Sequence, residues 1–362
     1  SVLIFVACIL QAVNVLKFNV FSHHNTLGLY APVCCSTERE LLYEVLTDRV
    51  FFCAPGEWTL YRCQQCGSAY LDPRPTLDTI GLAYSKYFTH NCDDRGNIQN
   101  LSWFRRIRRI LANGYLNYRF GTKYHPASSL GILAALLFSS KRAVLESQGR
   151  NLPKHGKGRL LDVGCGNGSF LELARQAGWE VVGVDPDPEA VAVACSRGLD
   201  VRQGDISVLD PSKEQFDGIT MSHVIEHVHD PRTTLAFCYQ LLKPGGWIWL
   251  ETPNLNSLGH AQYKSCWLHL DPPRHLVLFT RSSLQYLLET AGFQKVEDQP
   301  YRPLCYGMFV SSKAIASGQD PYENKSRTLS IIDRWEIYNA ECKAKKDVTV
   351  REFITMKAWK TK

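Results

Sequence analysis

The stretch from Leu160 to Leu171 constrains the fold more than any other part of the chain. A short apolar run, residues 160–163, leads through three glycines at alternate positions into an amphipathic segment that starts at Ser169. This order is typical of a buried parallel strand, a tight turn and a helix N-terminus. Glycine allows the turn positive φ angles and close approach of a ligand, and the unpaired N–H groups of the helix start form a polar cradle.

The next apolar run indicates a nucleoside site beside this turn. Residues 179–184 are expected to form a strand that ends in Asp185, 17 residues past Gly168. In a βαβ unit this carboxylate lies beside the first turn, where it can accept both hydroxyls of a ribose. The dinucleotide fingerprint G-x-G-x-x-G does not fit, because the third glycine comes one position early and Ser169 stands where the fingerprint has glycine.

From Arg159 onward, strand-like and helix-like segments alternate regularly. This alternation predicts an α/β fold with a doubly wound sheet. A late alternating stretch, residues 348–357, is typical of a final strand. The other expected strands are 201–203, 216–222 and 247–252, and the expected helices are 188–197, 282–291 and 331–342.

Several of these segments together resemble the class I S-adenosylmethionine (SAM) dependent methyltransferases. The pattern Asp162-x-Gly-x-Gly-x-Gly is similar to motif I of that family, and residues 241–246 are similar to a turn that often accompanies it. Residues 266–280 resemble a segment of bacterial small-molecule and cell-surface glycan methyltransferases, which often carry an N-terminal cysteine ribbon. The resemblance covers about residues 31–300. It implies a Rossmann-like seven-stranded sheet completed by an antiparallel strand, with SAM as the cofactor.

The resemblance also implies which residues contact the cofactor. Asp205, after the third strand, would accept from the adenine amino group, and the N–H of Ile206 would face a ring nitrogen. The tip of the fourth strand would border the sulfonium, and Cys165 is expected to be a small packing residue rather than a nucleophile. The expected cofactor-binding residues are Asp162, Gly164, Cys165, Gly166, Gly168, Asp185, Pro186, Asp205, Ile206, Ser222 and His223.

Three histidines are candidates for the chemistry. Methyl transfer is an in-line displacement, so the protein mainly aligns donor and acceptor, and a hydroxyl acceptor also benefits from a general base. His227 lies one helical turn beyond His223, so both can face the methyl group. His275 has Arg274 and Asp271 close in sequence, which suggests an oriented base or an acceptor-binding cluster. For all three histidines the alternative is a purely structural role.

A carboxylate beside these histidines is expected to have a supporting role. Glu226 should pair with a nearby donor rather than act as a base. Because the sequence offers no carboxylate cluster suited to a catalytic magnesium ion, we expect metal-independent transfer.

Residues 31–75 are expected to form a small zinc-ribbon-like module. Cys63 and Cys66 form a C-x-x-C-G knuckle after a strand-like stretch, residues 58–62, and Cys34 supplies a third thiol. Zinc needs four ligands in a tetrahedron, but Ala31 stands where the first knuckle would have its leading cysteine. The candidates for a fourth ligand are Cys35, Cys53 and His24. The alternative is a ribbon that folds by its hairpins without a metal, and in either case its role would be structural or substrate-docking.

Residues 76–157 are expected to be a helical region and linker. Ser102 can cap a helix that has an apolar face and a basic side. Such a helix can lie on a membrane or bind an anionic, lipid-linked substrate. The alternative is that it packs on its own domain with the basic side in solvent. Residues 131–138 are expected to be a lid or a core helix. The apolar face contains Trp103, Phe104, Ile107, Ile110 and Leu111, and the basic side contains Arg105, Arg106, Arg108 and Arg109.

The length of 362 residues favours two or three units. Residues 1–30 are expected to be a leftover or misassigned leader, with a buried helix or a membrane anchor as alternatives, since their apolar run is too short to span a bilayer. Residues 158–362 are expected to be the SAM-binding domain with a C-terminal insertion.

Thirteen scattered cysteines favour a reducing, cytoplasmic location. A net charge of +6 is too small to indicate nucleic acid, but permits an anionic substrate or a membrane surface.

The sequence therefore predicts an enzyme that transfers a methyl group from SAM to an oxygen or nitrogen atom. The expected acceptor is a small molecule or a sugar or glycan intermediate, with peripheral membrane contact as a further hypothesis. The alternative is a non-catalytic SAM-binding scaffold or regulatory module, because a fold does not imply a function. The glycine spacing disfavours a nicotinamide-dependent oxidoreductase.

Overall fold

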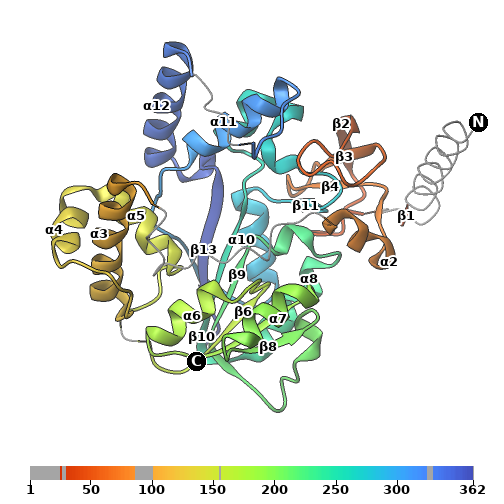
Figure 1. Cartoon of the computed structure of the whole chain (residues 1–362). Coiled ribbons are helices and arrows are strands. Elements are labelled where there is room, and N and C mark those ends of the chain that lie inside the picture. Colours follow the sequence, from red (N-terminus) through yellow and green to blue (C-terminus); the bar gives the residue numbers. More distant parts are fainter. Residues whose placement is uncertain (1–24, 27–29, 86–100, 155, 324–328, 362) are drawn as a thin grey trace, which may run out of the picture.

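A seven-stranded sheet forms the centre of the molecule in a computed structural model (Figure 1). The structure describes residues 25–26, 30–85, 101–154, 156–323 and 329–361. The strand order is β12-β13-β10-β9-β6-β7-β8, and β13 pairs antiparallel with both of its neighbours. The expected doubly wound, Rossmann-like sheet with an antiparallel C-terminal strand is confirmed.

The strands of this sheet follow the expected order along the chain. The apolar residues of β6, the first strand of this sheet along the chain, are buried on both faces, as a central parallel strand requires. The last strand begins later than expected, because residues 348–350 form a 3-10 turn (η6, Val348–Val350) instead. The strands are β6 (Arg159–Val163), β7 (Glu180–Asp185), β8 (Asp200–Gln203), β9 (Phe216–Ser222), β10 (Leu242–Pro253), β12 (Gln294–Asp298) and β13 (Phe353–Trp359).

Helices between the strands begin where the sequence offers caps. Asp187 accepts from the N–H groups of Glu189 and Ala190 at the start of α7, where Pro188 occupies the first helical position. The helices expected after 188, 282 and 331 are all present. The helices of this part are α6 (Ser169–Gln176), α7 (Pro188–Ser196), α8 (Pro231–Leu241), α9 (Leu258–Tyr263), α10 (Arg281–Thr290), α11 (Cys305–Ala316) and α12 (Ile331–Lys346), with 3-10 turns η2 (Ile206–Val208), η3 (Ile225–His227), η4 (Lys264–Cys266) and η5 (Leu268–Leu270).

The N-terminal module forms a second sheet that borrows a strand from the larger part of the chain. Its order is β11-β4-β3-β2, and β11 (Val277–Leu278) comes from the segment that follows the central parallel strands. Leu276 donates its N–H to the Glu226 carbonyl and accepts from the N–H of Leu71, so one backbone segment links the N-terminal sheet to the turn η3 that follows β9. The remaining elements are β1 (Asn25–Thr26), β2 (Arg39–Leu46), β3 (Trp58–Cys63), β4 (Ala69–Leu71), β5 (Arg74–Pro75), α2 (Leu77–Ile80) and η1 (Gly81–Tyr84).

The two sheets also share one hydrophobic core. Trp58 and Leu60 of the N-terminal module belong to the same buried cluster as Ile219 and Leu250 of the central sheet. Because the apolar side chains of both sheets are removed from water together, the N-terminal module and the central sheet stabilise each other.

The helical region lies at one side of the molecule (Figure 1). It contains α3 (Trp103–Phe120), α4 (Leu130–Leu137) and α5 (Ser139–Gln148). The C-terminal half of α3 is buried, including Leu116 and Phe120, but its N-terminal half is exposed. Of the two alternatives for 131–138, the core helix is wrong, because all four leucines of α4 face solvent, whereas the lid stays a prediction. Among the described residues, no helix combines the length and apolar character that crossing a bilayer requires.

Candidate active site

The glycine turn between β6 and α6 has the left-handed backbone conformation that its glycines predict. Gly164, Gly166 and Gly168 all have positive φ, at 69°, 52° and 76°. A Cβ atom on Gly164 would come within 2.3 Å of Val224 Cγ2, so there is no room for a side chain. The N–H of Gly166 donates to Asp185 Oδ2 at 2.7 Å. The turn and the end of β7 are therefore locked together.

Two acidic residues of this region are buried and held by named partners. The other Asp185 oxygen accepts from the Asp187 N–H at 3.0 Å. Asp162 pairs with Arg150 and accepts from Thr220 Oγ1 at 2.9 Å. Burial raises the pKa of Asp162, although Arg150 opposes the shift. Its Oδ2 is buried without a hydrogen-bond partner among the described residues, so it can accept from a bound cationic or hydroxyl group.

The remaining expected cofactor residues lie at the carboxyl ends of the strands. Asp205 follows β8 and is exposed; its Oδ1 accepts from the N–H of Ser207 at 2.8 Å. Ile206 is buried behind it and Pro186 is exposed after β7. Cys165 is buried, and burial raises the pKa of its thiol, as expected for a packing residue.

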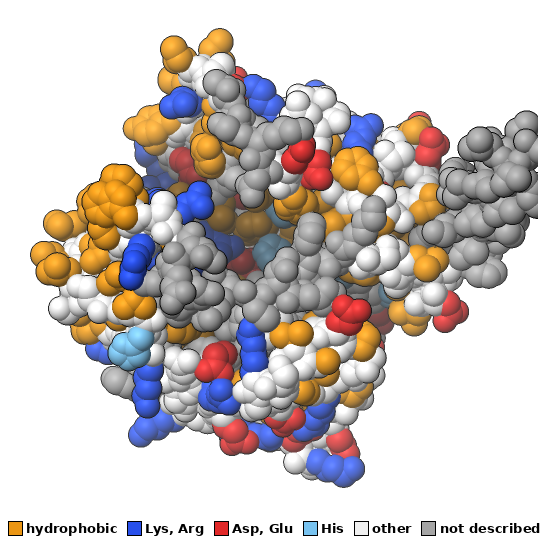
Figure 2. Space-filling view, in the orientation of Figure 1, with side chains coloured by type: hydrophobic (Ala, Val, Ile, Leu, Met, Phe, Trp, Pro, Cys, Tyr) orange, Lys and Arg blue, Asp and Glu red, His pale blue; other side chains and the backbone are white. Residues whose placement is uncertain are grey.

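A cavity of about 900 Å³ opens between the helical region, α6 and the ends of β9 and β10. Ser222 lines it, but none of the other expected cofactor or catalytic residues does. The sequence missed its most informative lining residues, which carry charge or an aromatic ring: Arg150, Phe170, Trp249, Glu251 and Arg302. Figure 2 shows this face of the molecule hollowed, with basic, acidic and histidine side chains in the hollow.

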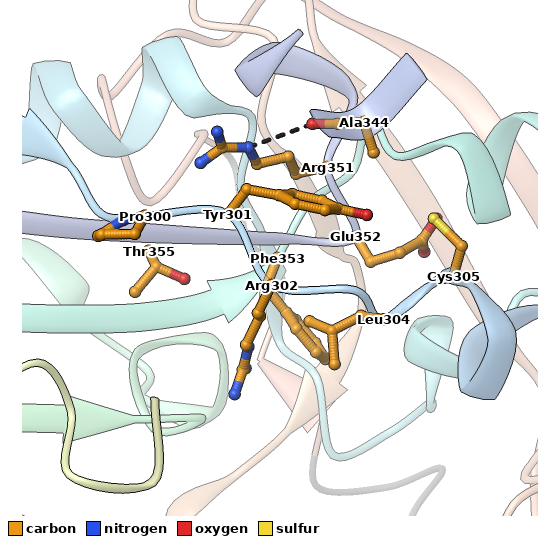
Figure 3. Close-up of a pocket in the computed structure, with 10 residues that line it drawn as sticks. All are labelled: Pro300, Tyr301, Arg302, Leu304, Cys305, Ala344, Arg351, Glu352, Phe353 and Thr355. Atoms are coloured by element: carbon orange, nitrogen blue, oxygen red, sulfur yellow. Dashed lines mark hydrogen bonds between the residues drawn. The ribbon is translucent and has the colours of Figure 1, made fainter. Parts of the chain in front are cut away.

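A second cavity of about 20 Å³ lies at the C-terminal part of the chain (Figure 3). Tyr301, Arg351 and Glu352 are among its lining residues, and Arg351 donates to the Ala344 carbonyl at 3.3 Å. It contains none of the residues that the sequence analysis singled out and holds about one water molecule. It is too small to be a substrate site.

His223 lies at the tip of β9 between two carboxylates. Its φ of 55° is unusual for a residue with a side chain, and its N–H donates to the Glu251 carbonyl at 2.8 Å. Its Nδ1 lies 3.3 Å from Glu226 and its Nε2 3.5 Å from Glu251. Burial lowers the pKa of His223, but the two carboxylates outweigh it and raise the pKa to about 9. The imidazole is therefore protonated at neutral pH.

His227 and His275 have the opposite electrostatic environment. Burial, together with the neighbouring His275, lowers the pKa of His227 to about 4, and burial also lowers the pKa of His275. His227 Nδ1 lies 2.9 Å from the Arg274 carbonyl, and His275 Nδ1 lies 2.7 Å from the His269 carbonyl. Since a carbonyl only accepts, each Nδ1 is assigned the proton and each Nε2 the lone pair. The Tyr84 hydroxyl oxygen, 2.9 Å from His227 Nδ1, is then a second acceptor for that proton. Both rings are neutral and oriented.

The three candidate histidines come together, but not by the expected helical spacing. His223 precedes the 3-10 turn η3 and does not share an α-helix with His227. A fourth histidine, His269, connects them: its ring centroid lies 6.3 Å from that of His223 and 6.0 Å from that of His275. The His227 and His275 ring centroids are 4.8 Å apart. The sequence analysis missed His269, although it stands in the same segment as His275.

Glu226 is buried and paired, as expected. It accepts from Thr252 Oγ1 at 2.9 Å, and His223 outweighs the effect of burial and lowers its pKa to about 2. However, the ligand atoms of Glu226, His227 and His275 lie within 4.8 Å of one another, close enough to hold a metal ion. Metal-independent transfer therefore stays a prediction, and assaying the protein after dialysis against a chelator tests it.

The sequence analysis suggested that Arg274 and Asp271 orient His275. Their side chains do not do so. The Arg274 guanidinium is buried between Asp48 and Asp271 and also donates to the Ala83 carbonyl at 2.9 Å. These two residues therefore fasten the N-terminal module to the segment that carries His275. Their backbone carbonyls reach the catalytic candidates instead: that of Arg274 lies 2.9 Å from His227 Nδ1, and that of Asp271 accepts from the His275 N–H at 3.2 Å.

The structure brings together the three cysteines expected to bind metal. The Sγ atoms of Cys34, Cys63 and Cys66 lie within 4.8 Å of one another. Two candidates for a fourth ligand lie elsewhere, since the Cys53 thiol donates to the Ala83 carbonyl and the Cys35 thiol lies 3.1 Å from the Arg232 guanidinium. The third candidate, His24, lies outside the described residues. The donor set of three thiols suits zinc.

Comparisons with known proteins find methyltransferases. Residues 136–298 match a family model described as a methyltransferase domain. The ubiquinone biosynthesis O-methyltransferase of Dinoroseobacter shibae is 35% identical over 192 residues, which cover 48% of this chain and 77% of that protein. The protein of the same name from Cereibacter sphaeroides is 30% identical over 172 residues, covering 44% and 70%. A solved SAM-dependent methyltransferase from Archaeoglobus fulgidus is 24% identical with a TM-score of 0.41, covering 63% and 99%.

Proposed function

The chain belongs to the class I SAM-dependent methyltransferase family, and we propose that it methylates a hydroxyl group of a small-molecule acceptor with His227 as the general base. The enzyme class follows from the relatives above. The named O-methyltransferases among them favour oxygen over nitrogen as the acceptor atom. A sugar or glycan acceptor, which the sequence analysis also allowed, becomes one arm of the acceptor screen.

The residues around the glycine turn fit SAM. The three glycines with positive φ leave the turn without side chains at these positions, which allows a ligand to approach its backbone closely. In the proposed arrangement Asp185 accepts from the ribose hydroxyls, and Asp205 and the N–H of Ile206 contact the adenine. Asp162 Oδ2, which has no partner among the described residues, accepts from the ammonium group of the methionine part. SAM supplies an activated methyl group at this place. The protein itself has to position the acceptor and exclude water.

The protonation of the histidines supports His227 as the base. A base must hold a lone pair at working pH, and a protonated His223 does not. His227 is neutral, and the Arg274 carbonyl orients its ring so that Nε2 is the free nitrogen. His275 is held in the same way and is the second candidate. In this proposal, His227 Nε2 would take the acceptor's hydroxyl proton as the carbon–oxygen bond forms and the methyl–sulfur bond of the bound SAM breaks, which would leave S-adenosylhomocysteine. The charge of His223 stays balanced by Glu226 and Glu251.

The cavity beside the site offers the acceptor both aromatic and polar lining residues. Phe170 and Trp249 contribute apolar surface, whereas Arg150 and Arg302 contribute N–H groups whose positive charge Asp162 and Glu251 already balance. An acceptor with a ring and hydrogen-bonding substituents fits this lining. The single observation that carries the proposal is the orientation of the His227 ring in η3, where Nδ1 lies 2.9 Å from the Arg274 carbonyl and Nε2 keeps its lone pair.

The experiment combines a binding and a turnover measurement. Calorimetric titration should show one S-adenosylhomocysteine per chain and no binding of NAD. A panel of hydroxylated aromatic compounds and sugars is then assayed for S-adenosylhomocysteine release. His227→Asn should lower kcat by about 10²–10⁴-fold and leave S-adenosylhomocysteine affinity unchanged.

His229→Asn is the matched control, because His229 is held by the Pro75 carbonyl and belongs to no candidate cluster. Full turnover in His227→Asn would mean that His227 is not the base, and His275 would be tested next. Folded protein that binds no S-adenosylhomocysteine would contradict the proposed enzyme and favour a decayed scaffold.

A further inference from the structure

The N-terminal half of α3 and the whole of α4 present a continuous apolar face to solvent. Figure 2 shows apolar side chains gathered over these two helices, on the left of the view. Soluble proteins rarely expose large contiguous apolar patches unless the patch binds something. Its large side chains, between 42% and 71% exposed, are Trp103, Phe104, Ile107, Leu130, Leu133, Leu136, Leu137 and Phe138. We call these residues the α3–α4 face.

The way the two helices pack explains why these side chains point outward. A Cβ atom on Gly131 would come within 1.9 Å of the Leu111 carbonyl oxygen, and one on Gly114 within 1.8 Å of the Ser128 carbonyl oxygen. The helices therefore touch backbone to backbone through glycines. Leucines on the opposite side of α4 cannot reach this contact, so their exposure follows from the fold itself.

The segment that contains α3 and α4 carries basic residues but no acidic ones. Residues 101–145 contain eight Lys and Arg residues and no Asp or Glu, which leaves 33 basic and 35 acidic residues in the rest of the chain. Arg105, Arg106 and Arg108 are exposed on the same helix turns as Trp103 and Phe104. A surface that combines aromatic and aliphatic side chains with arginines matches the interface of an anionic bilayer.

We propose that the α3–α4 face binds the surface of an anionic phospholipid bilayer. The leucines and aromatic rings enter the boundary between headgroups and acyl chains, and the arginines contact lipid phosphates. This inference goes beyond the proposed reaction and does not depend on it. Because α3 to α5 also border the 900 Å³ cavity through Lys123, Ser147 and Gln148, the bound protein would present that cavity close to the membrane.

A second exposed apolar stripe in the molecule makes a matched control. Ile331, Ile332, Trp335 and Tyr338 of α12 are all more than half exposed. Acidic residues, Asp333 and Glu336, interrupt this stripe. If apolar exposure alone caused membrane binding, both stripes would matter. If the α3–α4 face and its neighbouring arginines are responsible, only substitutions in that region weaken binding.

The test is co-sedimentation of the full chain with vesicles, at about 0.1 M salt, made of phosphatidylcholine alone or with one third phosphatidylglycerol. We expect binding to the anionic vesicles only. Arg105→Gln, Arg106→Gln and Arg108→Gln should weaken it about fivefold per arginine. Trp103→Ser with Phe104→Ser, and Leu133→Ser with Leu136→Ser, should also weaken it several-fold, whereas Trp335→Ser should not.

Every variant keeps residues 1–30, so differences among variants come from the substituted face. Circular dichroism and S-adenosylhomocysteine titration confirm that each variant is folded. The proposal is overturned if the wild-type chain ignores anionic vesicles, or if it binds them and the α3–α4 variants bind equally well. It is also overturned if sedimentation shows that this face instead joins two copies of the chain and the same variants abolish that association.

Discussion

His223 and His227 stand four positions apart, yet their surroundings drive their protonation in opposite directions. Two carboxylates hold His223 protonated, and burial beside a second histidine holds His227 neutral. The sequence places both residues at the end of β9 but cannot assign their charge. Glu251 comes from β10 and His275 from the segment before β11, so the difference arises only when these elements meet.

This difference predicts an opposite pH dependence of stability for the two residues. An unfolded histidine titrates near 6.5. The folded pKa of His227 is about 4, so the stability that it contributes is lost as pH falls from about 6.5 towards 4. The folded pKa of His223 is about 9, so its contribution is present below 6.5 and lost as pH rises towards 9.

Urea midpoints measured from pH 4.5 to 9 test both signs. We expect His227→Asn to flatten the loss of stability on the acid side and His223→Asn to flatten it on the alkaline side. His229→Asn again serves as control. If each substitution changed the profile on the opposite side, the assigned protonation states would be reversed.

At the scale of elements, the cysteine ribbon shows what short-range sequence patterns can achieve. Cys63 and Cys66 lie in the turn between β3 and β4, so their proximity follows from the hairpin alone. Cys34 joins them at the start of the module, and its Sγ lies 3.5 Å from that of Cys63. Whether a metal fills this set is a prediction.

We expect the purified chain to contain about one zinc ion, because three clustered thiols suit zinc better than other cations. Cys63→Ser should release the metal and lower the unfolding temperature. Cys195→Ser changes an exposed cysteine outside the cluster and should do neither. Elemental analysis by mass spectrometry measures the content. A metal-free wild type from zinc-supplemented growth, with unchanged stability in Cys63→Ser, would show a ribbon that folds by its hairpins.

At the scale of the whole molecule, the N-terminal module behaves as part of the larger fold. It shares a hydrophobic core with the central sheet, and β11 completes its sheet. The buried Arg274 joins Asp48 of the module to Asp271 of the segment that carries His275. We therefore infer that the module helps to shape the active site, and we expect the two parts to unfold together.

Arg274→Met tests this inference, because it leaves two carboxylates in a buried place without their counter-charge. Removing one partner of a buried pair typically costs about 3–5 kcal/mol. We expect a loss of that size and a single transition, with circular dichroism and tryptophan fluorescence coinciding in urea. Arg274→Lys should lose less, and Lys213→Met, at an exposed position, should lose almost nothing. Separate transitions in the wild type would contradict the shared core.

The sequence by itself determined the order of strands and helices, the glycine turn and the cysteine knuckle. These depend on the period of apolar residues and on local backbone geometry, which neighbouring residues carry. Tertiary structure alone decided that Arg150 holds Asp162, that Arg302 and Trp249 line the cavity, and that Arg274 pairs with Asp48, 226 positions away. It also decided that the leucines of α4 face solvent, since the glycine contact with α3 determines which side of that helix is covered. Such contacts depend on which elements pack together, and no short stretch of sequence records that.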